Sequence, residues 1–245
     1  MPTARRTIVL GLALVIAAAA TGCRRDGAAS PEPRHDRALR DQPQPANAVE
    51  DSMTNAQLEH TLENDELGMV FVWPQHENTL AAIWSLPGNP QLLESVLNDP
   101  GAPGRARLIA AEVLFAKDFS FIDRTNHDRL ARLYAEALVK RYTGHANAWG
   151  MLWDGNDAGQ VGGRFIVLGD DAIPALVTLL EDGSVVDWYA GSEDATVGNG
   201  HKYRIKDFAA FYLGRILGTP IAFHVDPAAR DREIATLRGA LRDRR

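Results

Sequence analysis

Two apolar helical patterns within residues 169–218 constrain the fold more than any other part of the sequence. The first pattern covers roughly residues 171–181 and the second roughly residues 203–217, with apolar side chains at helical spacing in each. A single amphipathic helix leaves its apolar stripe in water, so neither helix can bury that stripe alone. The pattern therefore predicts an antiparallel helix pair, stacked on further pairs, in an all-α protein.

Residues at the ends of these two helices provide start and stop signals. Asp170 or Asp171 is the expected N-cap of the first helix, and Pro174 falls in its first turn, where the missing N–H costs nothing. Gly218 and then Pro220 are typical residues for ending the second helix. These signals define the expected bounds of both helices to within one or two residues.

The helix pair has a second copy upstream, in residues 90–116. Asp99 lies in that copy where Asp182 lies in the later one, and Arg105 corresponds to Arg204. The matched apolar residues are Leu93, Val96, Leu97, Ala110, Ala111 and Leu114 in the first copy and Leu176, Leu179, Leu180, Ala209, Ala210 and Leu213 in the second. Alanines at the tightest positions let neighbouring helix axes approach closely, as stacked repeats require.

These residues resemble the HEAT-like α-helical repeats, in which a proline opens an apolar helix, an Asp follows near the turn, and an Arg opens an Ala-rich second helix. The resemblance implies an irregular α-solenoid of stacked helical hairpins that serves as a binding surface. Only two copies are recognisable, and 21 residues separate Asp182 from Arg204 where five separate Asp99 from Arg105. The residues that follow the pattern are Ile173, Pro174, Leu176, Leu179, Leu180, Asp182, Arg204, Ala209, Ala210, Leu213, Gly214 and Ile216.

The N-terminus has the pattern of an export signal. Arg5 and Arg6 precede the apolar run of residues 8–20, and small residues lead from there to Cys23. At 1.5 Å per residue a helix over that run reaches only about 20 Å, short of the roughly 30 Å hydrocarbon core, which disfavours a transmembrane anchor. The segment looks like a bacterial lipoprotein signal, and that resemblance implies a signal peptide over residues 1–22 and a lipid on Cys23.

Cys23 is the only cysteine in the chain. Lipidation would leave the mature protein without a disulfide, a cysteine metal ligand or a thiol nucleophile. Arg24 follows, and in the lipoproteins that the segment resembles, a residue other than Asp at this position is compatible with sorting to the outer membrane. We therefore expect a lipid-anchored protein of the bacterial cell envelope that faces the periplasm.

Residues 24–50 contain four prolines and almost no large apolar residue, so residues 23–50 are predicted to form a lipidated, disordered tether. Residues 51–245 are then expected to form a single α-helical repeat-like domain. The chain has a formal net charge of −6 and the tether is neutral, while Arg5 and Arg6 give the signal a charge of +2, so this domain carries −8. A surface this acidic argues against nucleic acid as a partner.

Further helices are expected around the two pairs. Thr54 and Gln57 form a potential capping box for a helix that reaches about residue 66. The run at residues 69–73 is compatible with a strand or with a buried connection. Two more helices are expected over residues 78–86 and over residues 126–142, the second with Thr125 or Asn126 as its N-cap. A C-terminal helix is expected to begin with Asp226 as its cap and Pro227 in its first turn.

Residues 145–168 contain Trp149 and Trp153, which are expected on a short helix, and then a glycine-rich link. That link lacks the Lys-Ser/Thr ending of a phosphate-binding loop and the spacing of a dinucleotide-binding one. A turn that allows close helix packing is the better interpretation. No serine-hydrolase elbow, zinc-protease motif or calcium loop occurs in the sequence, so no catalytic residue or cofactor is assigned.

The connection at residues 183–203 is the strongest candidate binding site. A connection of about 20 residues without regular structure is uncommon unless it is functional or disordered, and its aromatic residues argue against disorder. Its side chains offer stacking area and directed acceptors for a protein or peptide partner. The candidate binding residues are Asp187, Trp188, Tyr189, Glu193, Asp194, His201 and Tyr203.

Three functions stay open for this chain. We favour a periplasm-facing lipoprotein whose helical stack and connection bind a protein or peptide of the envelope. A metal-dependent hydrolase is the second, with Glu193, Asp194 and His201 around a divalent ion. The third is a structural envelope component without a discrete site, in which Val185, Val186 and Trp188 only cover the end of the helix pair.

Overall fold

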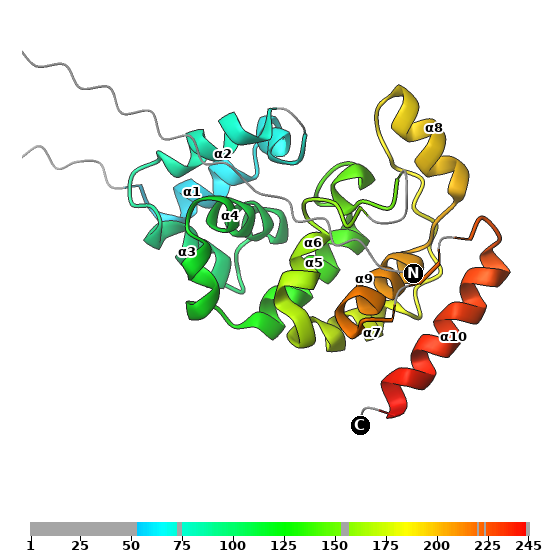
Figure 1. Cartoon of the computed structure of the whole chain (residues 1–245). Coiled ribbons are helices and arrows are strands. Elements are labelled where there is room, and N and C mark those ends of the chain that lie inside the picture. The colour runs from blue at the N-terminus through cyan, green and yellow to red at the C-terminus, as the bar shows by residue number, and fades with distance from the viewer. Residues whose placement is uncertain (1–52, 73–74, 153–156, 220, 223, 244–245) are drawn as a thin grey trace, which may run out of the picture. The chain divides into compact units, whose positions relative to one another are not determined.

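The computed structural model describes residues 53–72, 75–152, 157–219, 221–222 and 224–243 (Figure 1). Within these ranges the chain is all-helical, with ten α-helices and four 3₁₀ helices, and its only β feature is an isolated antiparallel bridge between Val185 and Arg204. The predicted all-α class is therefore confirmed. All of these residues belong to one contact unit, Val49–Arg245, and the predicted signal peptide, Cys23 and the tether lie outside the described residues.

The first helix begins as the sequence predicts and ends earlier. Helix α1 is Asn55–Leu62, and the Thr54 hydroxyl accepts a hydrogen bond from the Gln57 N–H while the Gln57 side chain accepts one from the Thr54 N–H. The chain then continues as the 3₁₀ helix η1, Asp65–Phe71. The apolar run that could have been a strand is thus helical up to Phe71, and helix α2 follows at His76–Trp84.

The two helix pairs recognised in the sequence both form. Helix α3, Gln91–Asn98, packs on α4, Gly104–Lys117, and α7, Ile173–Leu179, packs on α9, Ile205–Leu217. The turn aspartates behave alike in both pairs. Asp99 accepts a hydrogen bond from the Gly101 N–H at 2.7 Å, and Asp182 accepts one from the Ser184 N–H at 2.8 Å. Each aspartate therefore makes an Asx turn directly after the first helix of its pair.

The start of α7 differs from the prediction. Neither Asp170 nor Asp171 caps it, because both lie in a short 3₁₀ helix, η4 (Gly169–Ala172), and Ala172 takes the N-cap position. The Asp171 carboxylate instead binds the His127 ring at 2.8 Å. Pro174 lies in the first turn as expected, and Gly218 ends α9 with a left-handed backbone.

The long connection between α7 and α9 is not an irregular loop. Residues Ser192–His201 form helix α8, which corrects the interpretation of residues 183–203 as a connection without regular structure. Gly198 and Gly200 lower the helix propensity of this segment and hid it from the pattern. Packing compensates: Gly198 lies directly against the ring of Tyr189, where any Cβ would collide.

The middle of the chain supplies helices α5, His127–Lys140, and α6, Gly163–Leu168. Asn126 caps α5 through the Arg129 N–H, as the sequence predicts. Trp149 does not lie on an α-helix, because a 3₁₀ helix, η3 (Ala146–Trp149), ends at Gly150, and Trp153 lies outside the described residues. The remaining 3₁₀ helix is η2, Phe119–Arg124.

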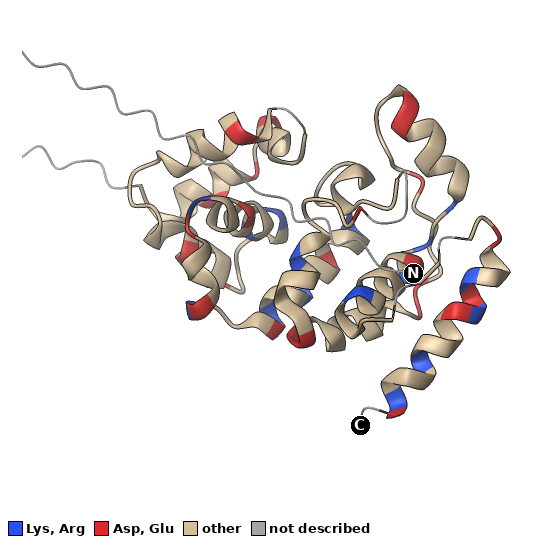
Figure 2. Ribbon diagram, viewed as in Figure 1, with Lys and Arg blue, Asp and Glu red and all other residues tan. Residues whose placement is uncertain are grey.

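The C-terminal helix α10, Pro227–Asp243, packs on α9. The Asp226 carboxylate accepts hydrogen bonds from the N–H groups of Ala228 and Ala229, so the predicted cap is confirmed. Ile234 and Leu237 are buried, while charged residues of both signs cover the rest of the helix (Figure 2). Among the described residues, no helix has both the length and the apolar character that crossing a bilayer requires.

The core extends from α1 to α10 as one cluster of buried apolar residues. Its fully buried aromatic residues include Trp149 and Tyr212, whose polar atoms are satisfied inside the protein. The Tyr212 hydroxyl donates to the Trp149 carbonyl at 2.5 Å, and the Trp149 ring N–H donates to the Thr143 hydroxyl at 3.0 Å. These bonds fix the segment before α6, which forms part of the site described next.

Candidate functional site

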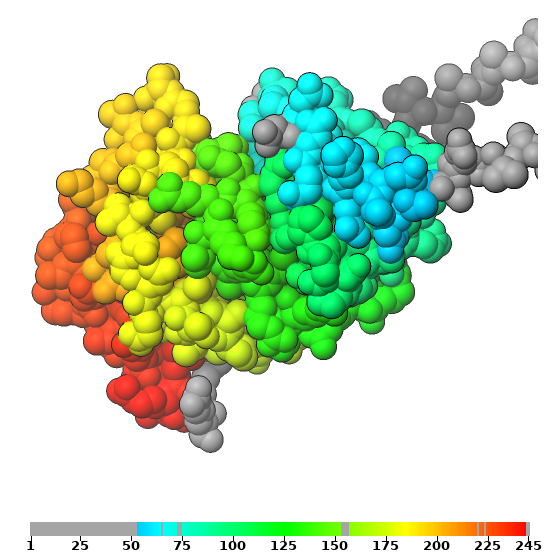
Figure 3. Space-filling model, turned by 180° about the vertical axis from the view of Figure 1, so that it is seen from behind, coloured from blue at the N-terminus to red at the C-terminus, as the bar shows by residue number. Residues whose placement is uncertain are grey.

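A cleft of about 970 Å³ lies beside helix α8. It lies between α2 and the end of α4 on one side and residues 145–148, 157–164 and 190–194 on the other. Figure 3 shows the surface hollowed between the yellow residues of α8 and the cyan residues of the N-terminal helices. We call it the α8 cleft. Its volume lies at the upper end of the range of ligand sites in proteins.

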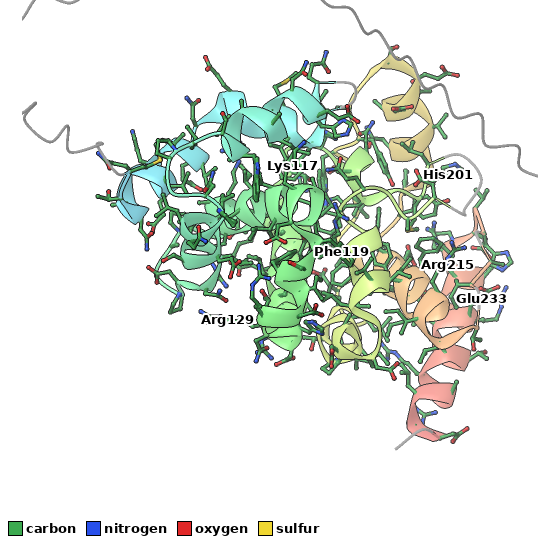
Figure 4. All side chains as sticks on the ribbon, turned by 60° about the vertical axis from the view of Figure 1, so that its left-hand side comes forward. Lys117, Phe119, Arg129, His201, Arg215 and Glu233 are labelled. Carbon is green, nitrogen blue, oxygen red and sulfur yellow. The ribbon has the colours of Figure 1, made fainter. Side chains whose placement is uncertain are left out.

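The N-terminal wall of the α8 cleft mixes apolar and charged side chains. Phe71 and Leu80 contribute apolar surface, Glu77 lies in the first turn of α2, and Lys117 is the last residue of α4. Figure 4 labels Lys117 there, at the end of its helix. Glu77 and Lys117 are both exposed, and neither forms an ion pair with a described residue. Both charges are therefore available to a ligand.

The floor of the α8 cleft rests on a buried charge pair. Glu112 of α4 is fully buried, and its two carboxylate oxygens each accept a hydrogen bond from Arg164 of α6 at 3.0 Å. Tyr134 and Gln160 donate to the same carboxylate at 2.6 and 3.1 Å. Burial alone would lower the pKa of Arg164, but the adjacent Glu112 raises it overall, so the guanidinium stays charged. This network joins α4, α5 and α6 beneath the cleft.

Asn147 fixes the C-terminal wall. Its amide oxygen accepts a hydrogen bond from the Ala190 N–H at 2.9 Å, and its amide nitrogen donates to the Ala190 carbonyl at 3.0 Å and to Asp194 at 2.8 Å. Gly191, with φ of 89°, then turns the chain into α8. One side chain thus ties η3 to the start of α8 and holds Asp194 at the cleft.

His145 lines the α8 cleft with an unsatisfied ring. Both ring nitrogens are buried, and neither makes a hydrogen bond of good geometry with a described residue. Burial lowers the pKa of His145, and the neighbouring Asn147 side chain opposes this only in part, so the ring is neutral at neutral pH. A buried polar group without a partner is rare in proteins and calls for an explanation such as a ligand. A neutral imidazole can both donate to a ligand and accept from it.

Of the candidate residues from the sequence, only Asp194 lines the α8 cleft. Tyr189 is buried beneath it and holds α8 in place, since its hydroxyl donates to the Gly150 carbonyl at 2.8 Å and its N–H donates to Asn199. Glu193 is exposed on the first turn of α8, next to Asp194 but outside the cleft lining. Figure 2 shows the acidic residues at that end of the helix.

The other candidate residues lie outside the cleft and pack the connection against the rest of the domain. Asp187 is exposed and lies 3.5 Å from Arg141, whose guanidinium also stacks over the half-buried Trp188 ring at 5.5 Å. His201 stacks on the buried Tyr203 with ring centroids 5.1 Å apart, at the opposite end of α8 from Asp194 (Figure 4). These residues are packed against the domain and do not converge on one ligand position.

The metal-dependent hydrolase interpretation has no geometric support. Glu193 and His201 are eight residues apart on α8, which corresponds to about 12 Å along the helix axis. No group of three potential His, Cys, Asp or Glu ligands occurs among the described residues. Glu193, Asp194 and His201 therefore do not form the set of metal ligands that a metal-dependent hydrolase needs around one ion.

The sequence did not identify most of the α8 cleft. Glu77, Lys117, His145, Gln160 and Arg164 are separated by up to 87 positions, and none belongs to a recognisable motif. The available signal was the run of residues 145–163, which combines polar side chains with glycines that permit close backbone approach. Gly150 and Gly159 lie against each other's backbones with positive φ angles, and this contact shapes the cleft wall.

Comparison with known proteins does not assign this chain to a family. Family models, curated proteins and solved structures all give no match to this chain. The function is therefore argued from the α8 cleft itself.

Proposed function

We propose that this protein is a lipid-anchored protein of the bacterial envelope whose helical domain binds an extended segment of another protein in the α8 cleft. The cleft is the observation that carries this proposal. It is open to solvent, and its lining combines apolar surface with donors and acceptors. A peptide needs both, because its side chains are partly apolar and each residue brings one backbone donor and one acceptor.

The polar groups of the cleft suit a peptide better than a small apolar ligand. Gln160 has an amide of which one N–H is used by Glu112, and the exposed Glu77 and Lys117 add a charged acceptor and a charged donor. Phe71, Leu80 and the small side chains of Ala116 and Ala148 provide the apolar contact area between them. A peptide can form hydrogen bonds to these polar groups and cover this apolar surface at the same time.

The HEAT-like arrangement remains part of the proposal. Its support is that α3 with α4 and α7 with α9 each form a contacting pair, with an Asx turn at the matched aspartate. Repeats of this kind present a surface formed by several helix pairs, and the α8 cleft lies between elements of the two pairs. The cleft is then the groove of a short, irregular stack.

The lipid on Cys23 would provide the anchor, and residues 24–50 would let the domain stand away from the bilayer. Metabolic labelling with a radioactive fatty acid tests this part. We expect label on the wild-type chain and none on Cys23→Ser. Equal label on both chains would contradict lipidation at Cys23.

Site-specific photo-crosslinking in the producing cells tests binding in the α8 cleft. A benzophenone amino acid is placed at Ala116 or Ala190, which are exposed and line the cleft, or at Val139, which is exposed on α5 away from it. The proposal predicts one adduct of the same mass from both cleft positions and none from Val139. Adducts from Val139 at equal yield, or no adduct from either cleft position, would contradict the proposal.

A further inference from the structure

The charge balance of the α8 cleft indicates the kind of segment it binds. Five charged side chains line it: Glu77, Asp157 and Asp194 are acidic, and Lys117 and Arg164 are basic. Glu112 neutralises Arg164 from below through two hydrogen bonds of 3.0 Å. Three carboxylates and one ammonium group remain, so the cleft has a formal net charge of −2 with its histidines neutral. A concave surface of one sign concentrates ligands of the opposite sign.

The three carboxylates keep acceptor capacity for a ligand. Asp194 uses one oxygen for Asn147, and Asp157 uses one for the Gly159 N–H at 2.7 Å. Glu77 accepts no hydrogen bond from a described residue. Each carboxylate has about four lone-pair positions, so all three can still accept a charge-assisted hydrogen bond.

The positions of these carboxylates suit long cationic side chains. Glu77 lies on the N-terminal wall, and Asp157 and Asp194 lie on the C-terminal one, with small residues such as Ala148 and Gly191 between them. Lysine and arginine can lay their aliphatic stems along apolar surface such as Leu80 and place the charged end at a carboxylate.

We propose that the α8 cleft selects a basic segment, a peptide whose lysine or arginine side chains contact Glu77, Asp157 and Asp194. This inference rests on the proposed function, since it assumes that the cleft binds a peptide. It adds that affinity depends on the charge of the cleft. Lys117 lies at one end and limits the number of cationic groups that the ligand can place there.

Peptide display on the full chain in neutral detergent micelles tests the charge preference. A library of short random peptides is selected separately on the wild type, on Glu77→Lys, on Lys117→Glu and on the control Glu193→Lys. Glu77 and Glu193 match well, because both are exposed glutamates in the first turn of a helix and only Glu77 lines the cleft. Circular dichroism confirms that each variant is folded.

The inference predicts that lysine and arginine are enriched over aspartate and glutamate by about fivefold among peptides retained by the wild type. Enrichment falls to background on Glu77→Lys, is kept or rises on Lys117→Glu, and is unchanged on Glu193→Lys. It also weakens with added salt, because exposed charges are screened. Spermidine, as a free polyamine, should compete more weakly than the selected peptides.

Three other results would overturn the inference. Enrichment of acidic peptides, lost on Lys117→Glu, would show a cleft that binds peptides of the opposite charge and would leave the proposed function intact. Enrichment that is the same on Glu77→Lys and on the wild type would place binding outside the cleft and contradict both proposals. Binding of spermidine without any selected peptide would indicate a small amine as the ligand.

Discussion

The two helix pairs, α3 with α4 and α7 with α9, share their turn chemistry and differ in what joins their helices. In the first pair five residues lead from Asp99 to Arg105, and in the second 21 residues lead from Asp182 to Arg204. The extra residues form α8 and the extended segment of residues 183–191 before it. This insertion contributes Ala190, Gly191 and Asp194 to the lining of the cleft. At the position of a short turn in the first pair, the second pair therefore has an insertion that lines the α8 cleft.

The matched arginines show the same divergence. Arg105 donates to the carbonyls of Glu63 and Asn64 and so closes the end of α1. Arg204 binds Asp207 at 2.8 Å and Asp231 at 3.0 Å, and it thereby joins α9 to α10. The two arginines, which occupy matching positions in the sequence pattern, therefore have different neighbours in the two helix pairs. The two pairs are alike in the Asx turn after the first helix.

Buried carboxylates give the largest expected effect in this comparison. Each pair has one in its second helix, Glu112 in α4 and Asp207 in α9. Removing one partner of a buried ion pair costs about 3–5 kcal/mol, because the other charge stays buried without compensation. We expect Glu112→Ala and Asp207→Ala each to lower the free energy of unfolding by about that amount in urea titrations. Arg132→Ala, which breaks an exposed pair with Asp128 on α5, should cost at most about 0.5 kcal/mol.

Glu112→Ala and Asp207→Ala should differ in their effect on crosslinking in the α8 cleft. Glu112→Ala releases Arg164 into the α8 cleft, so it should also change crosslinking from Ala116 in whatever fraction stays folded. Asp207 lies on α9, pairs with Arg204 and Arg230, and does not line the cleft, so Asp207→Ala should leave the crosslinking of the folded fraction unchanged. If the two variants changed crosslinking equally, the conclusion that Glu112 supports the cleft and Asp207 does not would be wrong.

Two glycines of α8 test whether the insertion is packed. A Cβ at Gly198 would collide with the Tyr189 ring, whereas Gly200 has nothing within 4 Å. Gly198→Ala should lower the free energy of unfolding by about 1–3 kcal/mol through overpacking. Gly200→Ala should raise it by about 0.5–1 kcal/mol, since alanine is the better helix former. Chemical denaturation measures both. Equal effects of the two substitutions would mean that α8 does not rest on Tyr189.

The Asn147 side chain tests the link between η3 and α8. Asn147→Ala removes three hydrogen bonds, two to the Ala190 backbone and one to Asp194. Since these groups are partly exposed, we expect a loss of about 1–2 kcal/mol and faster hydrogen exchange at residues 190–194. The exposed Asn78→Ala should cost less than about 0.5 kcal/mol and leave exchange there unchanged. If hydrogen exchange at residues 190–194 is unchanged in Asn147→Ala, Asn147 does not hold the start of α8 in place.

The smallest expected effect on stability comes from the side chains just before the first helix of each pair. Before α3, the neutral amide of Asn89 donates to the Ile83 carbonyl at 2.7 Å. Before α7, the Asp171 carboxylate binds His127 at 2.8 Å, and this bond raises the pKa of His127 above its ordinary value of 6.5. A raised pKa stabilises the fold fully below about pH 6.5, and this contribution is lost as the pH rises through the folded value.

Because both side chains are partly exposed, this contribution is about 0.5 kcal/mol after screening by solvent. We expect the wild type to lose that much more stability than His127→Gln between pH 5.5 and pH 8.5, as measured by urea titration at each pH. His60→Gln on α1, in an exposed position, serves as the control. A pH dependence that His127→Gln leaves unchanged would assign it to other groups.

The sequence predicted those parts of the fold that local chemistry decides. Thr54, Asn126 and Asp226 cap helices as expected, and Gly218 ends α9, because each acts on backbone groups within a few residues. Helix α8 was missed because Gly198 is favourable only once Tyr189 packs on it. That contact is tertiary, and a propensity pattern does not contain it.

The α8 cleft was largely beyond prediction for a related reason. Its residues come from α2, the end of α4, the segment around η3 and the start of α8, so no window of sequence contains the site. Asp194 was among the candidates because it belongs to a polar segment rich in glycine. His145 belongs to no sequence motif, and only the burial of its ring nitrogens without a hydrogen-bond partner distinguishes it from other histidines.

Blocking the α8 cleft tests the central claim most directly. The crosslinker is placed at Ala190, and the cleft is filled by Ala116→Trp, with Val139→Trp on α5 as the matched substitution outside it. We predict that Ala116→Trp lowers the yield of the adduct at least about tenfold, equivalent to 1.4 kcal/mol of binding, and that Val139→Trp leaves it unchanged. An adduct that persists in folded Ala116→Trp at the wild-type yield would show that the partner does not occupy the α8 cleft.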